Sequence, residues 1–397
     1  MMAMQTATWR YRLTTPGALA FATCYFFESL ARATLVTVLP LQALALLGQA
    51  RNVSILYALA GSITVVLGLF MPMLTRRFRP GRVYAAGGAS MALAPLCLAL
   101  ATPTGLAAAV IFTTVGQSLL VNGMNLMMMM NVGKRDLVYA DSLKLFGGAT
   151  PWLFGPALGV YLFEHDASLW AIGLSAAAGL AVVVYAGMLD VAHPESPLAQ
   201  VPPATFRPIH SFRRFLAQPR LRLAWVLNFA KTSFWATFFV YGPLYIVTVG
   251  IDTTTGSIAI SIAAGLLYII PAFAWLARRI GVRPVIIGGF AVIGVSMALV
   301  TLAANHAAIA IALILIGAIA GVALDATTSV TFLRAVRARE RPEMGMVYSY
   351  TRDAAGLLPH TLFAILLSFF GLDAVFIVTA LGTLACAWLG RWVPRSM

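Results

Sequence analysis

Long runs of apolar residues, separated by short polar connections, dominate the chain. A helix of about 20 apolar residues crosses the hydrocarbon core of a bilayer and satisfies its own backbone hydrogen bonds. Twelve runs have roughly this length or more. They cover residues 17–47, 53–75, 83–101, 105–131, 138–163, 168–189, 222–249, 256–277, 284–303, 307–333, 346–370 and 373–392. The pattern predicts an all-α integral membrane protein with twelve transmembrane helices.

Composition supports this interpretation. Of the 397 residues, 60% are hydrophobic and only 10% are charged, whereas soluble domains carry about 25% charged residues. Cys24, Cys97 and Cys386 all lie within apolar runs and show neither metal-ligand spacing nor a disulfide framework. We therefore expect no metal and no cofactor.

The net charge of +14 would favour nucleic acid as a partner of a soluble protein, but here its distribution is more informative. Twelve spans place both termini and every loop after an even-numbered span on one side. That side receives 22 of the 27 Lys and Arg residues, and the loops of the other side receive Arg51 together with four carboxylates. Basic loops stay in the cytoplasm. We expect a multi-pass protein of the bacterial inner membrane with cytoplasmic termini and no nucleic-acid partner.

One connection is much longer than the others. Residues 190–221 contain six prolines and divide the chain into a first unit, 1–189, and a second unit, 222–397. Within this linker, apolar residues recur at helical spacing beside Arg213 and Arg214. The spacing is typical of a short helix lying on the inner membrane surface, and an ordinary basic loop is the alternative.

The two units resemble each other. At an offset of 203 residues, 25–42 align with 228–245, so that Pro40 matches Pro243 and Glu28 matches Lys231. At an offset of 208, Lys144 in the fifth span matches Arg352 in the eleventh. Matches in chain order at a nearly constant offset indicate a parallel repeat of six spans about an axis along the membrane normal.

With this organisation the chain resembles the major facilitator superfamily over nearly its whole length. The loop between spans two and three resembles the family signature through Gly68 and the basic residues of 75–82, although arginine occupies the position of the usual aspartate. The residues concerned, with their counterparts in the second unit, are Gly68, Arg76, Arg77, Arg82, Arg278 and Arg279. A second likeness, to the Gly-Pro motif in span five of many exporters, rests on Gly155, Pro156 and Gly159.

The resemblance implies two pseudo-symmetric six-helix bundles that expose a central site alternately to each side. Spans one, four, seven and ten would line its cavity. Charged residues inside a membrane are costly and usually face a cavity or a partner. Glu28 and Arg32 share one helix face with Tyr25, and Asn228, Lys231 and Trp235 form the matching face of span seven. We expect Glu28 and Lys231 to pair as a gate across the seam, the boundary between the two bundles. A static Glu28–Arg32 pair is the alternative.

The remaining polar groups of the spans complete the predicted site. Lys144 and Arg352 would attract an anion from matched positions, unless they reach toward lipid headgroups instead. Expected substrate-binding residues are Tyr25, Arg32, Asn122, Asn125, Lys144, Asn228, Lys231, Trp235 and Arg352. Expected proton-coupling or gating residues are Glu28, Lys231, Asp325 and Asp353. His360 is interpreted as a packing histidine in preference to a proton carrier.

These features favour a proton-coupled secondary transporter, and not an enzyme, for a small organic anion or amphiphilic compound. We expect it to act as a monomer. The span-five motif favours efflux, and proton-linked import of a small organic anion is the first alternative. A non-transporting receptor or membrane enzyme is the rival class, but the catalytic motifs of such enzymes are missing from the sequence. The methionines of 124–131 leave copper transport as a minor alternative, because thioethers bind Cu(I).

Overall fold

The computed structural model describes residues 18–132, 137–192, 208–303, 306–337 and 340–394, and within these ranges the regular structure is entirely helical. The first unit contains α2 (Ala18–Val36), α3 (Val38–Leu47), α4 (Ala50–Arg77), α5 (Pro80–Leu98), α6 (Pro103–Asn131), α7 (Leu137–Glu164) and α8 (Ser168–Ala192). The second contains α10 (Pro219–Thr248), α11 (Thr253–Gly265), η2 (Leu266–Ile269), α12 (Ile270–Ile280), α13 (Val282–Leu302), α14 (Ala307–Ala335), α15 (Arg341–Leu366), α16 (Asp373–Leu389) and η4 (Gly390–Trp392). A short helix, α9 (Pro208–Leu216), precedes the second unit.

Two of the predicted spans are interrupted helices. The run at 17–47 forms α2 and α3, which meet at Thr37 shortly before Pro40. The run at 256–277 forms α11 and α12, joined by the 3₁₀ turn η2 just before Pro271. Proline lacks the backbone N–H that an α-helix needs, so a break or tighter turn beside it is expected.

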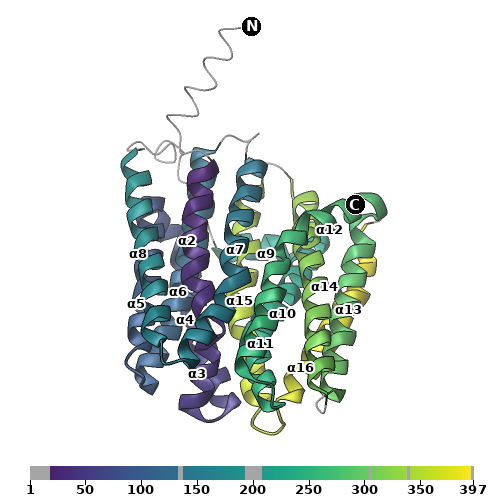
Figure 1. The fold of residues 1–397 in the computed structure, drawn as a ribbon. Helices are drawn as coiled ribbons and strands as arrows, with labels where there is room; N and C mark the ends of the chain where they lie inside the picture. Colours follow the sequence, from purple (N-terminus) through teal and green to yellow (C-terminus); the bar gives the residue numbers. More distant parts are fainter. Residues whose placement is uncertain (1–17, 133–136, 193–207, 304–305, 338–339, 395–397) are drawn as a thin grey trace.

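Eight helical stretches of the described residues are long and apolar enough to cross a membrane. The helices α5, α7, α10 and α15 are not among them, although they run alongside the others in Figure 1. Lys144, Lys231 and Arg352 lower the hydropathy of three of these four helices. The all-helical membrane fold is therefore confirmed, and the count of twelve spans stays a prediction.

The helices of each unit pack mainly against one another. In the first unit α5 packs between α6 and α8, and α2 packs along α7; in the second, α13 packs between α14 and α16. Contacts between the units run chiefly along α4 with α15 and along α7 with α11 (Figure 1).

Glycine permits the closest helix crossings. A Cβ atom added at Gly61 of α4 would collide with the backbone of Gly356 in α15. Within the first unit, Gly155 and Gly159 of α7 lie directly against the backbone of Ala33 and Thr34 in α2. The glycines of the span-five motif therefore serve close packing between α2 and α7, as small residues do between membrane helices.

The two ends of the molecule are packed differently. We call the end where α4 finishes at Arg77 and α13 starts at Val282 the basic end, and the opposite end the far end. One buried core contains residues of both units. Its first-unit residues, among them Leu39 and Val110, lie toward the far end, and in the second unit it continues to Val282 at the basic end. Toward the basic end, the first unit has its own core around Met124. A separate cluster around Phe215 belongs to α9 and the second unit.

The short helix expected in the linker is present as α9, but its apolar face contacts protein. Phe215 is fully buried among residues of α10, α14 and α15, and the Phe212 ring packs on Tyr350 of α15. Arg214 Nη2 donates to Glu340 Oε1 at 2.6 Å. Protein therefore covers Phe215, whereas Leu216 of the same helix is exposed, and the position of α9 on the membrane surface stays a prediction. Nearly half of the predicted linker, residues 193–207, lies outside the described residues.

Candidate functional site

A cavity of about 380 Å³ lies between the two units. Its walls come from α2, α3, α4, α6 and α7 on one side and from α10, α11, η2, α14 and α15 on the other. Leu39, Val110 and Val240 line it and also belong to the core that joins the units at the far end. These core residues therefore close the cavity on the side that faces the far end.

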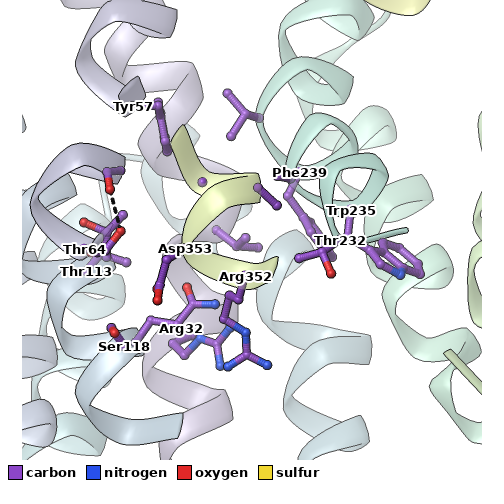
Figure 2. Close-up of a pocket in the computed structure, with 18 of the residues that line it drawn as sticks. Arg32, Tyr57, Thr64, Thr113, Ser118, Thr232, Trp235, Phe239, Arg352 and Asp353 are labelled. Carbon is purple, nitrogen blue, oxygen red and sulfur yellow. Dashed lines mark hydrogen bonds between the residues drawn. The ribbon is translucent and has the colours of Figure 1, made fainter. Parts of the chain in front are cut away.

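The structure brings six of the predicted site residues to this cavity. They are Tyr25, Arg32, Trp235, Asp325, Arg352 and Asp353. They come from both units, as a site between repeated bundles requires. Arg32 and Arg352 extend to the same part of the cavity in Figure 2.

Glu28 lies behind this surface in a dry environment. Its side chain is fully buried, Arg32 Nη1 lies 3.3 Å from its Oε1, and the Tyr84 hydroxyl of α5 donates to its Oε2 at 3.2 Å. All of these partners belong to the first unit. Burial of a charge is tolerated where the charge is paired and hydrogen-bonded, as it is here.

Lys231 has a different partner from the one that the repeat predicts. Its Nζ lies 3.0 Å from Asp325 Oδ1, and the indole Nε1 of Trp235 donates to Asp325 Oδ2 at 2.9 Å. The expected Glu28–Lys231 pair across the seam is therefore wrong for this conformation. The physical reason is that each residue already has an oppositely charged partner within its own unit.

Arg352 and Asp353 are the least compensated charges of the site. The Arg352 side chain is exposed to the cavity, and it takes part in no ion pair among the described residues. Figure 2 shows it beside Arg32, whose charge repels it, while the charges of Asp353 and Glu28 attract it. Asp353 also lines the cavity, and its carboxylate lies beside Gly68 of α4, at the seam between the units. Within the described residues no hydrogen bond to its carboxylate is found.

Besides Lys231, four predicted substrate-binding residues do not line the cavity. Asn122 donates to the Ser118 carbonyl of its own helix, and Asn125 is exposed elsewhere. Asn228 Nδ2 donates to Thr351 Oγ1 at 2.6 Å and so joins α10 to α15. Lys144 pairs with Asp141 at 2.6 Å, and its ammonium group lies over the Tyr25 ring. In this conformation the polar groups of Asn122, Asn228 and Lys144 therefore bind other groups of the protein.

Sequence reasoning missed an aromatic wall of the cavity. Trp152 of α7 packs against Phe239 of α10 with ring centroids 5.2 Å apart, and Phe239 stacks on Trp235 at 5.7 Å. The Arg32 guanidinium lies 5.5 Å from the centroid of the Trp152 ring. A signal was available: at the offset of 208, Trp152 matches His360, and both residues line the cavity.

His360 is part of a buried polar network at the far-end side of the cavity. Its Nδ1 lies 3.1 Å from the Tyr241 hydroxyl, which is itself 2.7 Å from Ser54 Oγ of α4. The Tyr57 ring of α4 also packs against the imidazole. The interpretation of His360 as a packing histidine agrees with these contacts, although the network links the two units.

The loop motif lies at the basic end, and one of its residues connects the units. The Tyr350 hydroxyl of α15 donates to the Gly68 carbonyl of α4 at 2.9 Å. Arg77 and Arg278 are exposed, and Arg279 lies over Trp275 at 4.1 Å from its ring centroid. The side chain of Arg76 lies outside the described residues.

Three of the methionines of span four pack in the interior. Met124, Met127 and Met128 are at most 4% exposed and belong to the core of the first unit. No group of three His, Cys, Asp or Glu side chains suited to a metal ion occurs in the part of the chain that the structure describes.

The chain is similar in sequence to a family of transport proteins and in fold to solved transporters. The model of the Major Facilitator Superfamily matches residues 21–359. A POT family transporter in complex with 5-aminolevulinic acid has a similar fold, with a TM-score of 0.74 at 12% identity over 94% of this chain and 95% of the transporter. The nucleoside transporter NupG, as a D323A mutant, has a TM-score of 0.73 at 13% identity over 94% of this chain and 98% of that one. No curated protein sequence matches the chain.

Proposed function

Because the chain belongs to the Major Facilitator Superfamily, a family of secondary transporters and not of enzymes, we propose that it moves a small organic anion by proton-coupled alternating access. The observation that carries this proposal is the unpaired Arg352 in the central cavity beside Arg32. A cation within a membrane protein that has no ion-pair partner among the described residues interacts strongly with an anion that enters its cavity.

The arrangement of the two cores supports alternating access. The units share a core at the far end, whereas their cores are separate toward the basic end. Since basic loops stay in the cytoplasm, the shared core would close the outer side in this conformation. The central site would then be reached from the cytoplasm. The same charge asymmetry supports placement in the bacterial inner membrane with both termini inside.

Asp353 is the group that we propose to carry the coupled proton. It lines the cavity at the seam, and its carboxylate has no hydrogen-bond donor among the described residues. A negative Asp353 next to the site repels an anionic substrate, whereas a protonated Asp353 does not. Binding of a proton and binding of an anion therefore favour each other, which couples their movement in the same direction.

The linkage between proton binding and anion binding also bears on the direction of transport. Cotransport with protons drives uptake where the proton gradient points inward, so the charges of the site favour import of an anion. The span-five motif favoured efflux, but its glycines are accounted for by the packing of α7 on α2. Efflux remains the second candidate, because an amphiphilic compound without a negative charge would gain from the ionised Asp353 instead.

The proposal is tested with purified protein in proteoliposomes under an imposed pH gradient. We expect accumulation of radiolabelled small carboxylates that follows the inward proton gradient. Accumulation should be lost in Lys231→Ala, Asp325→Asn and Asp353→Asn, while Asp353→Asn should retain exchange of anion for anion. Arg391→Gln, which changes an exposed arginine that does not line the cavity, serves as the matched control.

Two results would count against the proposed function. Equal accumulation with and without the gradient would exclude proton coupling. Specific binding of an anion without any flux, in vesicles where the protein is correctly inserted, would favour the rival class of a non-transporting receptor. Cross-linking in native membranes tests the expectation of a monomer separately.

A further inference from the structure

The central cavity has a charged region that receives one guanidinium group from each unit. Arg32 comes from α2 and Arg352 from α15, and their side chains approach each other in Figure 2. Arg32 has one contact with Glu28, at 3.3 Å, and Arg352 has no ion pair among the residues described. The repulsion between the two groups disappears when a carboxylate lies between them, because guanidinium groups and carboxylates form paired hydrogen bonds.

An aromatic surface adjoins this charged region. Arg32 lies over Trp152, Trp152 packs on Phe239, and Phe239 stacks on Trp235. All of these residues line the cavity, and the surface crosses from the first unit to the second. A flat ring attached to a carboxylate held by Arg32 would lie against these aromatic side chains, in the offset or edge contacts that aromatic pairs prefer.

The opposite wall carries hydroxyl side chains, and one of these hydroxyl groups has no hydrogen-bond partner among the described residues. In Figure 2, Thr64, Thr113 and Ser118 lie across the cavity from Trp235 and Phe239. The Ser118 side chain is 4% exposed, and its Oγ finds no hydrogen-bond partner in the described part of the molecule. Buried hydroxyl groups are normally satisfied, so the free Oγ points to a polar group of a ligand in the cavity.

We propose that the substrate is an aromatic carboxylate, held with its carboxylate between Arg32 and Arg352 and its ring on the Trp152–Phe239 surface. This inference rests on the proposed function and specifies its substrate class. The cavity of about 380 Å³ lies near the lower limit for small-molecule sites and suits a single ring. Asp325 is already occupied by Lys231 and Trp235, so an amine on the ligand would find only Asp353.

Binding is measured by calorimetry on the purified protein in detergent at one fixed pH. The probes are benzoate, cyclohexanecarboxylate, which keeps the carboxylate and nearly the same size without aromaticity, and benzyl alcohol, which keeps the ring without the charge. We expect benzoate to bind about 3- to 10-fold more tightly than cyclohexanecarboxylate, the gain typical of aromatic contacts. Benzyl alcohol should bind too weakly to measure.

Three cavity variants and two controls assign the effect to the charged region and to the aromatic surface. Arg352→Gln should weaken benzoate binding by about 10- to 100-fold, as expected for loss of hydrogen bonds between charged groups. Arg352→Lys, which retains the charge without the planar group, should recover part of the affinity. Trp152→Leu should remove the preference for benzoate while leaving the affinity for cyclohexanecarboxylate unchanged. Arg279→Gln and Trp275→Leu are the matched controls, because this arginine–tryptophan pair lies outside the cavity.

The outcomes separate this inference from the proposed function. Equal affinity for benzoate and cyclohexanecarboxylate, or no effect of Arg352→Gln, overturns the aromatic site even if carboxylates are transported. Gradient-driven flux of aliphatic but not aromatic carboxylates overturns it as well and leaves the proposed function intact. Absence of flux for every anion in the proteoliposome assay defeats the proposed function itself.

Discussion

Two charged groups occupy matched positions in the two units, yet their surroundings differ. Glu28 and Lys231 correspond in the repeat. Glu28 is fully buried and held by Arg32 and Tyr84. Lys231 and its partner Asp325 have side chains 17% and 22% exposed, and Asp325 lines the cavity. A dry pair in the first unit thus corresponds to a hydrated pair in the second.

The difference shows that a repeat conserves the position of a charge without conserving its environment. Glu28 cannot exchange its partners without leaving a charge unpaired in the interior, which is strongly unfavourable. The Lys231–Asp325 pair can separate at lower cost, because water in the cavity solvates both charges. We therefore expect the first group to stabilise the fold and the second to take part in the transport cycle.

Removal of Arg32 should have the largest effect on the stability of the protein. In Arg32→Ala the buried carboxylate of Glu28 retains the Tyr84 hydrogen bond but loses its ion-pair partner. We expect the free energy of unfolding to fall by about 3–5 kcal/mol, measured by denaturation in mixed micelles. Lys231→Ala should lower the free energy of unfolding by only about 1 kcal/mol, because water in the cavity can hydrate Asp325. Equal losses in the two variants would show that the two pairs do not differ in hydration.

Reversal of both charges in a pair should have a smaller effect on stability and tests which residues are in contact. The double variant Lys231→Asp with Asp325→Lys restores opposite charges at the two positions whose native side chains lie 3.0 Å apart. We expect it to recover about 1–3 kcal/mol relative to the sum of the single reversals, the coupling typical of contacting charges. The double variant Glu28→Lys with Lys231→Glu should recover nothing. Rescue by this second exchange, measured as stability and as flux, would support a direct Glu28–Lys231 contact in another conformation.

Replacement of Trp235 should have the smallest effect. Trp235→Phe removes the hydrogen bond from Nε1 to Asp325 Oδ2 and keeps the aromatic contact with Phe239. A loss of about 1 kcal/mol is expected, because water in the cavity replaces the donor. The measurement is the shift in melting temperature, with Trp275→Phe as the control. A loss as large as that of Arg32→Ala would place Asp325 in a dry environment and remove the distinction between the units.

The fold was predictable from the sequence to a large extent. Apolar runs indicated the helices within a few residues, and the repeat indicated how the units correspond, because a membrane helix must satisfy its own backbone. The break between α11 and α12 before Pro271 could also have been expected. The contacts of α9 could not, because an amphipathic helix has the same pattern whether lipid or protein covers its apolar face.

The site was predictable only in part. Placement on spans one, seven, ten and eleven identified Arg32, Trp235, Asp325 and Arg352 as cavity residues, because charges in a membrane avoid lipid. The choice of partners was not predictable. Asp325 and Lys231 are far apart in the sequence, and the alignment favoured a symmetric Glu28–Lys231 pair over the contact between α10 and α14 that the structure shows.

The crossing of α4 and α15 has a mechanical consequence. Where Gly61 lies against Gly356, the backbones of the two units touch without intervening side chains. Both helices extend well beyond this point in each direction, so under the proposed alternating access this contact would be a pivot between the units. A methyl group added at Gly61 would collide with the Gly356 backbone, push the units apart at that pivot and change how far each side of the cavity can open.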